Sequence, residues 1–215
     1  MTATGVFGDE VKSVSVMEGD SLTLYSNITD IPRDDHIQWR FGPQKTPIAK
    51  INKAANKAPI YDDVLDGRFR DRLQVNNQTG DLIITNITTQ HTGLYKITIR
   101  GKQETSYGFN VFVYARLPIP VITTQNSSSS ETSSCVLLCS VLNVRDVSLS
   151  WYKGNSLLSI ISVSDLNIII SISLHLECLN DSYSCVVNNP ISNQTQHLNT
   201  DLCQTCSDTT GVIIY

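Results

Sequence analysis

The stretch Tyr183-Ser184-Cys185, together with Cys139 and Trp151 before it, decides the fold of the C-terminal part of this chain. A cysteine, a tryptophan and a second cysteine in this order and spacing are typical of two packed β-sheets that a disulfide joins beside the tryptophan ring. Tyr183 stands just before Cys185, where the hydroxyl of a tyrosine corner ties a turn back to the backbone. The sequence therefore predicts a β-sandwich with a bridge between Cys139 and Cys185.

Short apolar stretches alternate with turn residues along the whole chain, and no window has the period of a capped helix. This pattern predicts an all-β protein. In the N-terminal part, alternation places apolar side chains on one face of each expected strand. The strands expected there cover residues 11–16, 21–25, 37–40, 48–51, 73–75, 82–84, 95–100 and 107–114. Their number is typical of a V-type immunoglobulin-like domain.

The N-terminal domain has the same skeleton as the C-terminal one but no cysteines. Trp39 takes the core position on its third strand, and residues 92–95 (TGLY) match the end of the D-x-G-x-Y turn. Ser26 and Ile97 stand where the usual cysteines would be. We therefore predict that residues 9–115 form a V-type domain that apolar packing alone holds together.

Two prolines, Pro118 and Pro120, follow the last strand of this domain and favour a short, extended connection. We place the domain boundary near Arg116, a C2-type domain over residues 116–206 and a truncated stalk over residues 207–215. Fewer strands are expected in this second domain. They lie near Val121 and at residues 135–141, 147–152, 168–176, 183–187 and 196–202.

Two stretches of the second domain invite other interpretations. The isoleucine-rich run from Ser159 to Leu179 has the apolar content of a membrane span, but polar residues interrupt it with period two. We interpret it as a strand with one buried face. The serine-rich residues after Asn126 resemble a linker but lie close to the next strand, so we interpret them as a surface loop.

Four cysteines remain once the bridge between the sheets is assigned. Cys135 shares a strand face with Cys139, and Cys203 falls near the end of the last expected strand, so Cys135–Cys203 is the preferred second bridge. Cys178 and Cys206 are left by elimination, and their pairing stays open. The C-x-x-C motif that Cys203 begins would also suit a redox site or half of a zinc site, but no second motif or histidine pair accompanies it. We expect structural disulfides, no metal and no other cofactor.

Glycosylation signals accompany the even number of cysteines, and together they indicate the oxidising secretory route. The expected glycosylation sites are Asn27, Asn77, Asn86, Asn126, Asn180 and Asn193. Residues 1–8 have no usable signal peptide, and the apolar residues 212–215 are far too few to span a bilayer. We expect an extracellular region whose membrane attachment, present in the full-length protein, is absent from this chain.

Charge and histidine content speak against two classes of protein. A formal net charge of −4 provides no basic surface, so nucleic acid is not an expected partner. No histidine belongs to a motif with a nucleophile or paired carboxylates, so we do not expect an enzyme. We expect the histidines to be surface or turn residues: His36, His91, His175 and His197.

A short basic cluster in the first domain, Arg68, Arg70 and Arg72, could bind an anionic glycan. Aspartates surround it, so we interpret it as a charge-balanced, solvated loop. His91 stands where many V domains have an aspartate that pairs with an arginine at the start of strand D. A neutral histidine cannot supply that permanent charge, so we do not expect the usual clamp on Arg68 or Arg72.

A V-type domain without its inter-sheet disulfide, followed by a C2-type domain with extra bridges, resembles the SLAM (signalling lymphocytic activation molecule) family and related two-domain lymphocyte adhesion receptors. Local matches lie at residues 18–24, 37–42, 79–84 and 188–195 (NNPISNQT), and the resemblance spans roughly residues 9–206. It implies a cell-surface immune receptor or ligand that mediates cell–cell adhesion and recognition. The alternative is a secreted decoy or soluble immune ligand with the same domains.

The resemblance also implies that the front sheet of the first domain, made by strands G, F, C and C′, binds the partner. If Ile37, Trp39 and Ile97 point inward, alternation points their neighbours outward. The expected partner-binding residues are His36, Gln38, Arg40, Lys96, Thr98 and Arg100. The partner implied is another immunoglobulin-superfamily cell-surface protein or a second copy of the chain. A polar, positively biased face suits weak contacts that many copies strengthen.

Overall fold

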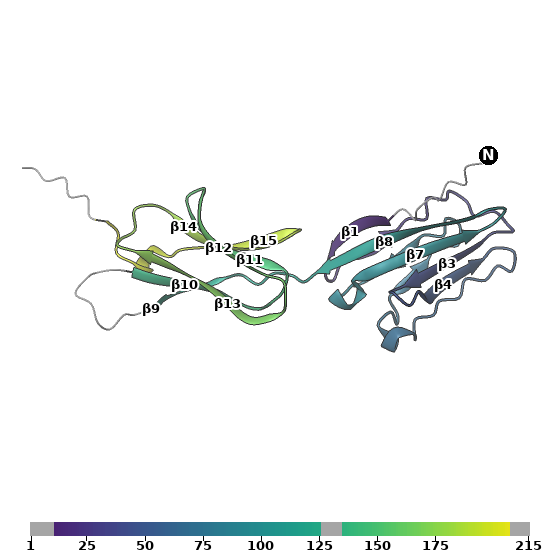
Figure 1. Cartoon of the computed structure of the whole chain (residues 1–215), viewed down its shortest axis with the longest axis horizontal. Coiled ribbons are helices and arrows are strands. Elements are labelled where there is room, and N and C mark those ends of the chain that lie inside the picture. Colours follow the sequence, from purple (N-terminus) through teal and green to yellow (C-terminus); the bar gives the residue numbers. More distant parts are fainter. Residues whose placement is uncertain (1–10, 126–134, 207–215) are drawn as a thin grey trace, which may run out of the picture. The chain divides into compact units, whose positions relative to one another are not determined.

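The computed structural model describes residues 11–125 and 135–206. The chain divides after Arg116 into two compact units, each with its own hydrophobic core. Regular structure in the described residues consists of strands and three short 3-10 turns (Figure 1). The expected loop after Asn126 and the expected stalk at residues 207–215 lie outside the described residues. No helix in the described part of the chain is long and apolar enough to cross a membrane.

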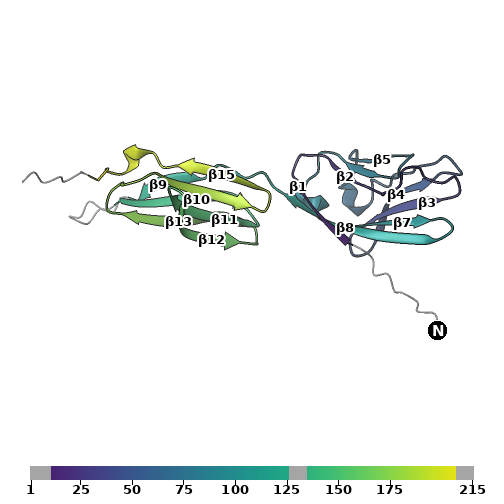
Figure 2. The same cartoon turned by 90° about the horizontal axis from the view of Figure 1, so that it is seen from above.

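The first domain is a sandwich of two sheets. One sheet has the order β1-β8-β7-β3-β4, in which β1 and β8 are parallel and the other neighbours antiparallel. The second sheet has the order β2-β6-β5, and Figure 2 shows β2 and β5 on one side and β3, β7 and β8 on the other. The strands are β1 (Val11–Met17), β2 (Leu22–Leu24), β3 (His36–Phe41), β4 (Thr46–Asn52), β5 (Leu73–Val75), β6 (Leu82–Ile84), β7 (Gly93–Arg100) and β8 (Glu104–Tyr114).

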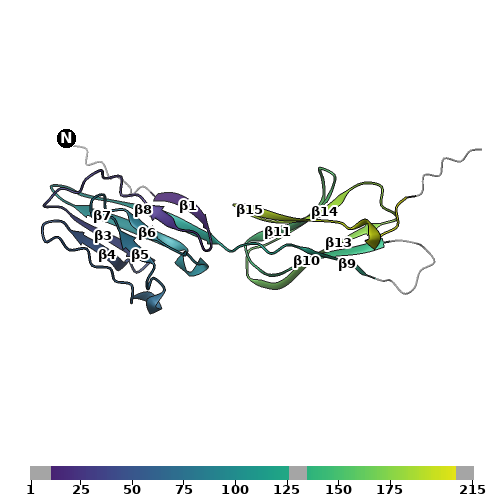
Figure 3. The same ribbon diagram turned by 180° about the vertical axis from the view of Figure 1, so that it is seen from behind.

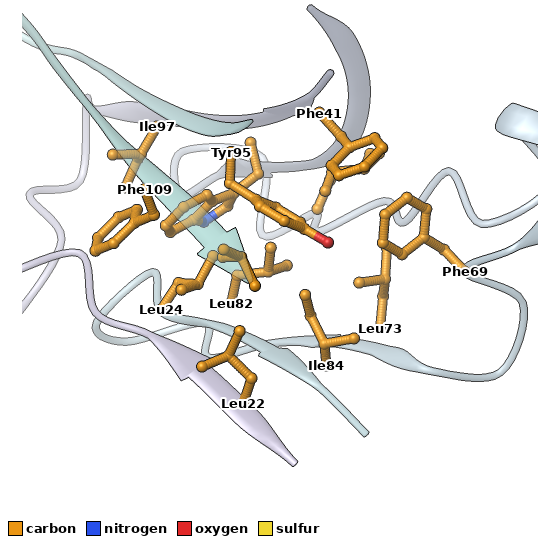
Figure 4. Packing of buried hydrophobic residues seen from close by; sticks show 14 of the residues in the cluster. Leu22, Leu24, Phe41, Phe69, Leu73, Leu82, Ile84, Tyr95, Ile97 and Phe109 are labelled. Carbon is orange, nitrogen blue, oxygen red and sulfur yellow. The ribbon is translucent and has the colours of Figure 1, made fainter. Parts of the chain in front are cut away.

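Large apolar side chains of both sheets fill the core of the first domain (Figure 4). Trp39 is fully buried, and its indole Nε1 donates a hydrogen bond to the carbonyl of Gly80 at 2.9 Å. Ser26 and Ile97, which stand where the usual cysteines would be, are both buried. The Tyr95 hydroxyl donates to the carbonyl of His91 at 2.8 Å. This domain therefore holds its sheets together by apolar packing and a tyrosine corner.

The second domain is a sandwich of a sheet ordered β13-β10-β9 and a sheet ordered β12-β11-β14-β15 (Figure 3). Trp151 is fully buried between them, and its Nε1 donates to the carbonyl of Ile172 at 3.0 Å. The strands are β9 (Val121–Gln125), β10 (Cys135–Val144), β11 (Val147–Lys153), β12 (Ser156–Val163), β13 (Asn167–Leu176), β14 (Tyr183–Asn189) and β15 (Ser192–His197). Two tandem immunoglobulin-like sandwiches, V-type and then C2-type, are confirmed.

The strand expected at residues 168–176 is confirmed as β13, but two other expectations about the strands of the second domain are wrong. The run from Ser159 to Leu179 is not one strand, because residues 164–166 divide it between β12 and β13, which belong to different sheets. Its apolar residues do not share one buried face either, since Ile168 is 81% exposed. The last strand ends at His197, because Thr200–Leu202 form a 3-10 turn that the Asn199 side chain caps.

The structure joins the six cysteines in three bridges and leaves none free. The Cα–Cα distances are 6.4 Å for Cys139–Cys185, 5.8 Å for Cys135–Cys203 and 5.0 Å for Cys178–Cys206. The two cysteines of the C-x-x-C motif thus belong to different bridges. The prediction for Tyr183 is wrong in one respect: its hydroxyl donates to the side-chain Oδ1 of Asn180 at 2.8 Å and not to the backbone.

Candidate binding face of the first domain

The outward face of the five-stranded sheet is the candidate site, and we call it the front face. Alternation buries Ile37, Trp39 and Phe41 of β3 and turns the residues between them outward. Antiparallel pairing of β3 with β7 sets these outward residues in rows. The six expected binding residues lie together in three such rows: His36 opposite Arg100, Gln38 opposite Thr98, and Arg40 opposite Lys96.

Thr98 differs from the other five because it is only 5% exposed. Its row places it between Gln38 on β3 and Ser106 on β8, in the middle of the sheet. The expectation that Thr98 presents surface to a partner is therefore wrong. Arg100 is exposed, and the remaining four expected residues are partly exposed.

Contacts within the front face order its polar side chains. Arg40 Nη2 donates to Gln38 Oε1 at 2.8 Å. Arg100 Nε donates to Glu104 Oε2 at 2.8 Å, and both side chains of this ion pair are 59% exposed. Glu104 offsets the charge of Arg100, so the face is less positive at this end than the sequence indicates. Among the described residues, His36 Nδ1 and Arg40 Nε are buried atoms without a hydrogen-bond partner.

The sequence reasoning missed four further residues of the front face, on β4, β8, β7 and β1. Lys50 of β4 is exposed opposite Gln38, and Glu104 of β8 ends the row of Arg100. Leu94 and Val11 lie on either side of Gly108 and are 39% and 52% exposed. Lys50 could have been found as the one charged residue between apolar neighbours. The place of Val11 could not, because the parallel pairing of β1 with β8 has no local sequence signal.

His91 is a turn residue, as one of the two expected places for the histidines, but it is buried and does not lie on the surface. It ends the 3-10 turn Thr89–His91 between β6 and β7. Its Nδ1 accepts from the backbone N–H of Thr88 at 2.9 Å, so Nε2 carries the proton and donates to the carbonyl of Arg68 at 2.8 Å. His91 therefore holds the backbone of Arg68 by a hydrogen bond, without the ion pair to the arginine side chain that an aspartate would form. Burial lowers the pKa of His91, and the positive charges of Arg72 and Arg68 act in the same direction.

The arginines of the basic cluster beside His91 already form hydrogen bonds or ion pairs with oxygen atoms of the domain itself. Arg70 forms an ion pair with Asp63 at 2.7 Å. Arg68 Nε donates to the carbonyl of Leu65 at 3.0 Å, and Arg72 donates to the carbonyl of Asn86. These contacts fit a charge-balanced loop better than an anion site. No group of three or more residues that could hold a metal ion occurs in residues 11–125 and 135–206.

The sequons of the first domain avoid the front face. Asn27, Asn77 and Asn86 are exposed, and they flank β2, β5 and β6, which form the sheet on the other side of the core. In the second domain, Asn180 precedes β14 and Asn193 lies on β15, both exposed. Asn126 is outside the described residues.

Comparison with known proteins identifies a protein of similar sequence. SLAM family member 5 of Mus musculus is 28% identical over 199 residues, which cover 89% of this chain and 54% of that protein. The chain is similar in sequence to this member of the SLAM family. It spans about half the length of this curated relative. No protein-family model matches the chain.

Solved structures share the fold of this chain. The CD2-binding domain of CD58 (lymphocyte function-associated antigen 3) has a TM-score of 0.63 and 18% identity, covering 88% of this chain and 98% of that one. Murine CEACAM1b has a TM-score of 0.60 and 18% identity, covering 88% and 94% of the two chains. At these identities the likeness shows the fold alone, and the relation to the SLAM family comes from the sequence.

Proposed function

We propose that the chain is the extracellular part of a cell-surface immune receptor or ligand that mediates cell–cell adhesion and recognition through its front face. The relation to SLAM family member 5 supports this class of protein. The partner in this proposal is another immunoglobulin-superfamily protein, either a family member or a second copy of the chain. The CD58 structure of the same fold is described as CD2-binding, which supports a protein and not a small molecule as the ligand.

The positions of the glycosylation sequons favour the front face, and not the opposite sheet, as the binding surface. An N-linked glycan is bulky and hydrophilic, so it obstructs the surface around its asparagine. Every sequon of the first domain lies beside the three-stranded sheet, and none lies on β3, β4, β7 or β8. Glycosylation at these sites leaves the front face as the open side of the domain. Its proposed contact residues are His36, Gln38, Arg40, Lys96 and Arg100, with Thr98 a covered neighbour.

The chemistry of the front face favours an acidic partner surface. Arg40, Lys96 and Lys50 add positive charge, and the Arg100–Glu104 pair supplies a donor and an acceptor at the edge. Exposed charges at an interface raise specificity and association rate more than affinity. Weak single contacts are then strengthened by the many copies on two apposed membranes.

The test is surface plasmon resonance with the glycosylated chain against SLAM-family ectodomains, its own copy included. We expect the triple variant Arg40→Glu, Lys96→Glu, Arg100→Glu to weaken binding by about 1–3 kcal/mol, more at low salt. Arg70→Glu is the matched control, because Arg70 is also an exposed arginine paired with a carboxylate in this domain but lies off the sheet. Circular dichroism shows whether each variant folds.

The possible outcomes test the binding face and the class of partner separately. Unchanged binding of the folded triple variant, or an equal loss in Arg70→Glu, rejects the front face. Absence of binding to every immunoglobulin-superfamily ectodomain rejects the partner class. Charge reversal of Arg145, which pairs with Asp146 in the second domain, should leave binding unchanged.

A further inference from the structure

The strands of the second domain carry almost no charge. From β9 to β15 they contain a single Asp, Glu, Lys or Arg side chain, Lys153 at the end of β11. The large sheet of the first domain contains six: Lys12, Arg40, Lys50, Lys96, Arg100 and Glu104. Charged residues, lysine above all, are a common device that prevents an edge strand from pairing with another chain. The edge strands of the second domain lack this protection.

Two of these edge strands lie on the same side of the sandwich. Among the described residues, β13 pairs with β10 alone and β12 pairs with β11 alone, so each has an open edge. Residues 164–166 connect the two strands directly, and the strands contact each other. Figure 2 shows β12 and β13 along one side of the domain and β9 and β15 along the other. We call the first of these the β12–β13 side.

Exposed apolar side chains cover the β12–β13 side. Ile168 and Ile169 of β13 are 81% and 57% exposed, and Leu142, directly opposite Ile169 on β10, is also 57% exposed. On β12, Leu158 and Ile160 are 44% and 53% exposed. Single exposed apolar residues are ordinary, but a cluster of this kind marks an interaction surface or an aggregation hazard.

Two of the four edge strands of the domain, β9 and β15, have a sequon on them or directly after them. Asn193 is an exposed residue on β15, and the sequon at Asn126 directly follows β9. No sequon lies on β12, on β13 or between them, and the remaining one, at Asn180, lies outside both strands in the connection from β13 to β14. Glycans would therefore obstruct strand pairing on the β9 and β15 side and leave the β12–β13 side open.

We propose that the β12–β13 side is a homotypic interface, at which β13 pairs antiparallel with β13 of a second copy of the chain. The open edge of β13 presents unpaired N–H and C=O groups, with which an extended strand of another chain can form hydrogen bonds. A second copy supplies a strand of equal length, and a two-fold pairing brings no like charges together because neither strand carries any. A charged partner strand would instead lose hydration against isoleucine without gaining an ion pair. This interface does not depend on the front face.

The test is sedimentation velocity and hydrogen exchange on the full glycosylated chain from micromolar to about 1 mM concentration. The chain carries the triple front-face reversal, so that association through the first domain is removed. We expect a reversible dimer, together with concentration-dependent protection of the amides in residues 167–176. The double variant Ile168→Lys, Ile169→Lys should raise the dimer Kd by about tenfold or more and abolish that protection.

Val121→Lys is the matched control. Val121 lies on β9, the opposite edge of the same sheet, and is 56% exposed, against 57% for Ile169. We expect this variant to dimerise like the parent. A chain that stays monomeric without protection of residues 167–176 overturns the proposal, as does a dimer that survives the double lysine variant. Growth beyond the dimer also overturns it, because a two-fold pairing closes.

Discussion

The imidazole of His91 connects two segments of the first domain by bonding at both ring nitrogens. Its Nδ1 accepts from Thr88, and its Nε2 donates to Arg68. Only the neutral ring can do both, because a protonated imidazole has two donors and no acceptor. The ring also contacts that of Phe69, with 5.0 Å between centroids. Protonation would therefore break the hydrogen bond from the Thr88 backbone N–H and place a charge in the core, where, among the described residues, only the hydroxyl and carbonyl oxygens of Thr88 lie close enough to Nδ1 to accept from it.

We predict that the first domain loses stability as the pH falls below about 6.5, the ordinary pKa of histidine. The unfolded chain takes up a proton there, whereas burial keeps the folded pKa lower, so the stability is complete above this pH and declines below it. Hydrogen exchange of residues 93–100 from about pH 8 to about pH 5, corrected for intrinsic rates, measures this loss. His91→Gln should flatten the dependence and His36→Gln should keep it. Equal pH dependence in the parent and His91→Gln would contradict the prediction.

The connection between β5 and β6 is the element on which the core of the first domain depends most closely. Gly80 lies there with a φ of +82°, and a Cβ added to it would overlap Cδ1 of Ile37. Its carbonyl also accepts the hydrogen bond from Trp39. The backbone conformation thus favours glycine at this position, and an added side chain would force Cδ1 of the buried Ile37 to move.

We predict that Gly80→Ala lowers the free energy of unfolding of the first domain by about 2–4 kcal/mol, through left-handed strain and overpacking together. Gly42→Ala separates the two causes, because Gly42 has a φ of +74° but no atom within 4 Å of an added Cβ. That variant should lose about 1–2 kcal/mol from strain alone. Denaturant unfolding measures both, and equal losses would be evidence against the packing contribution.

The two domains differ in what holds their sheets together. The first relies on its apolar core, since no cysteine precedes Cys135. The second contains three bridges, of which Cys139–Cys185 joins its two sheets across a separation of 46 residues. Closing a loop of this length stabilises a fold by about 4 kcal/mol where chain entropy dominates.

We predict that the first domain unfolds before the second on heating. Calorimetry gives the transitions, and hydrogen exchange of residues 93–100 and 183–189 assigns them to the two domains. A reducing agent should lower the transition of the second domain and leave that of the first unchanged, since the first has no bridge to lose. A second domain that melts first under oxidising conditions would refute this order.

Local patterns in the sequence were enough to predict the class of fold and much of the front face. Period-two alternation shows which residues of a strand share a face, and it depends only on the chain's own geometry. The alternation around Trp39 therefore brought the six expected residues to one face correctly. The spacing of Cys139, Trp151 and Cys185 predicted the second sandwich, because these residues must meet in its core.

Tertiary structure decided how each of these residues is surrounded, which depends on strands distant in sequence. Thr98 is buried although alternation turns it outward, and His91 is buried against Phe69 and bonded to Arg68. The isoleucine-rich run around Ile168 was predicted as one strand with a buried face, yet its division between two edge strands depends on which sheet each half joins, and Ile168 is exposed. Alternation determines the side of a strand on which a residue lies, but burial and hydrogen bonding depend on the neighbours that the fold brings there.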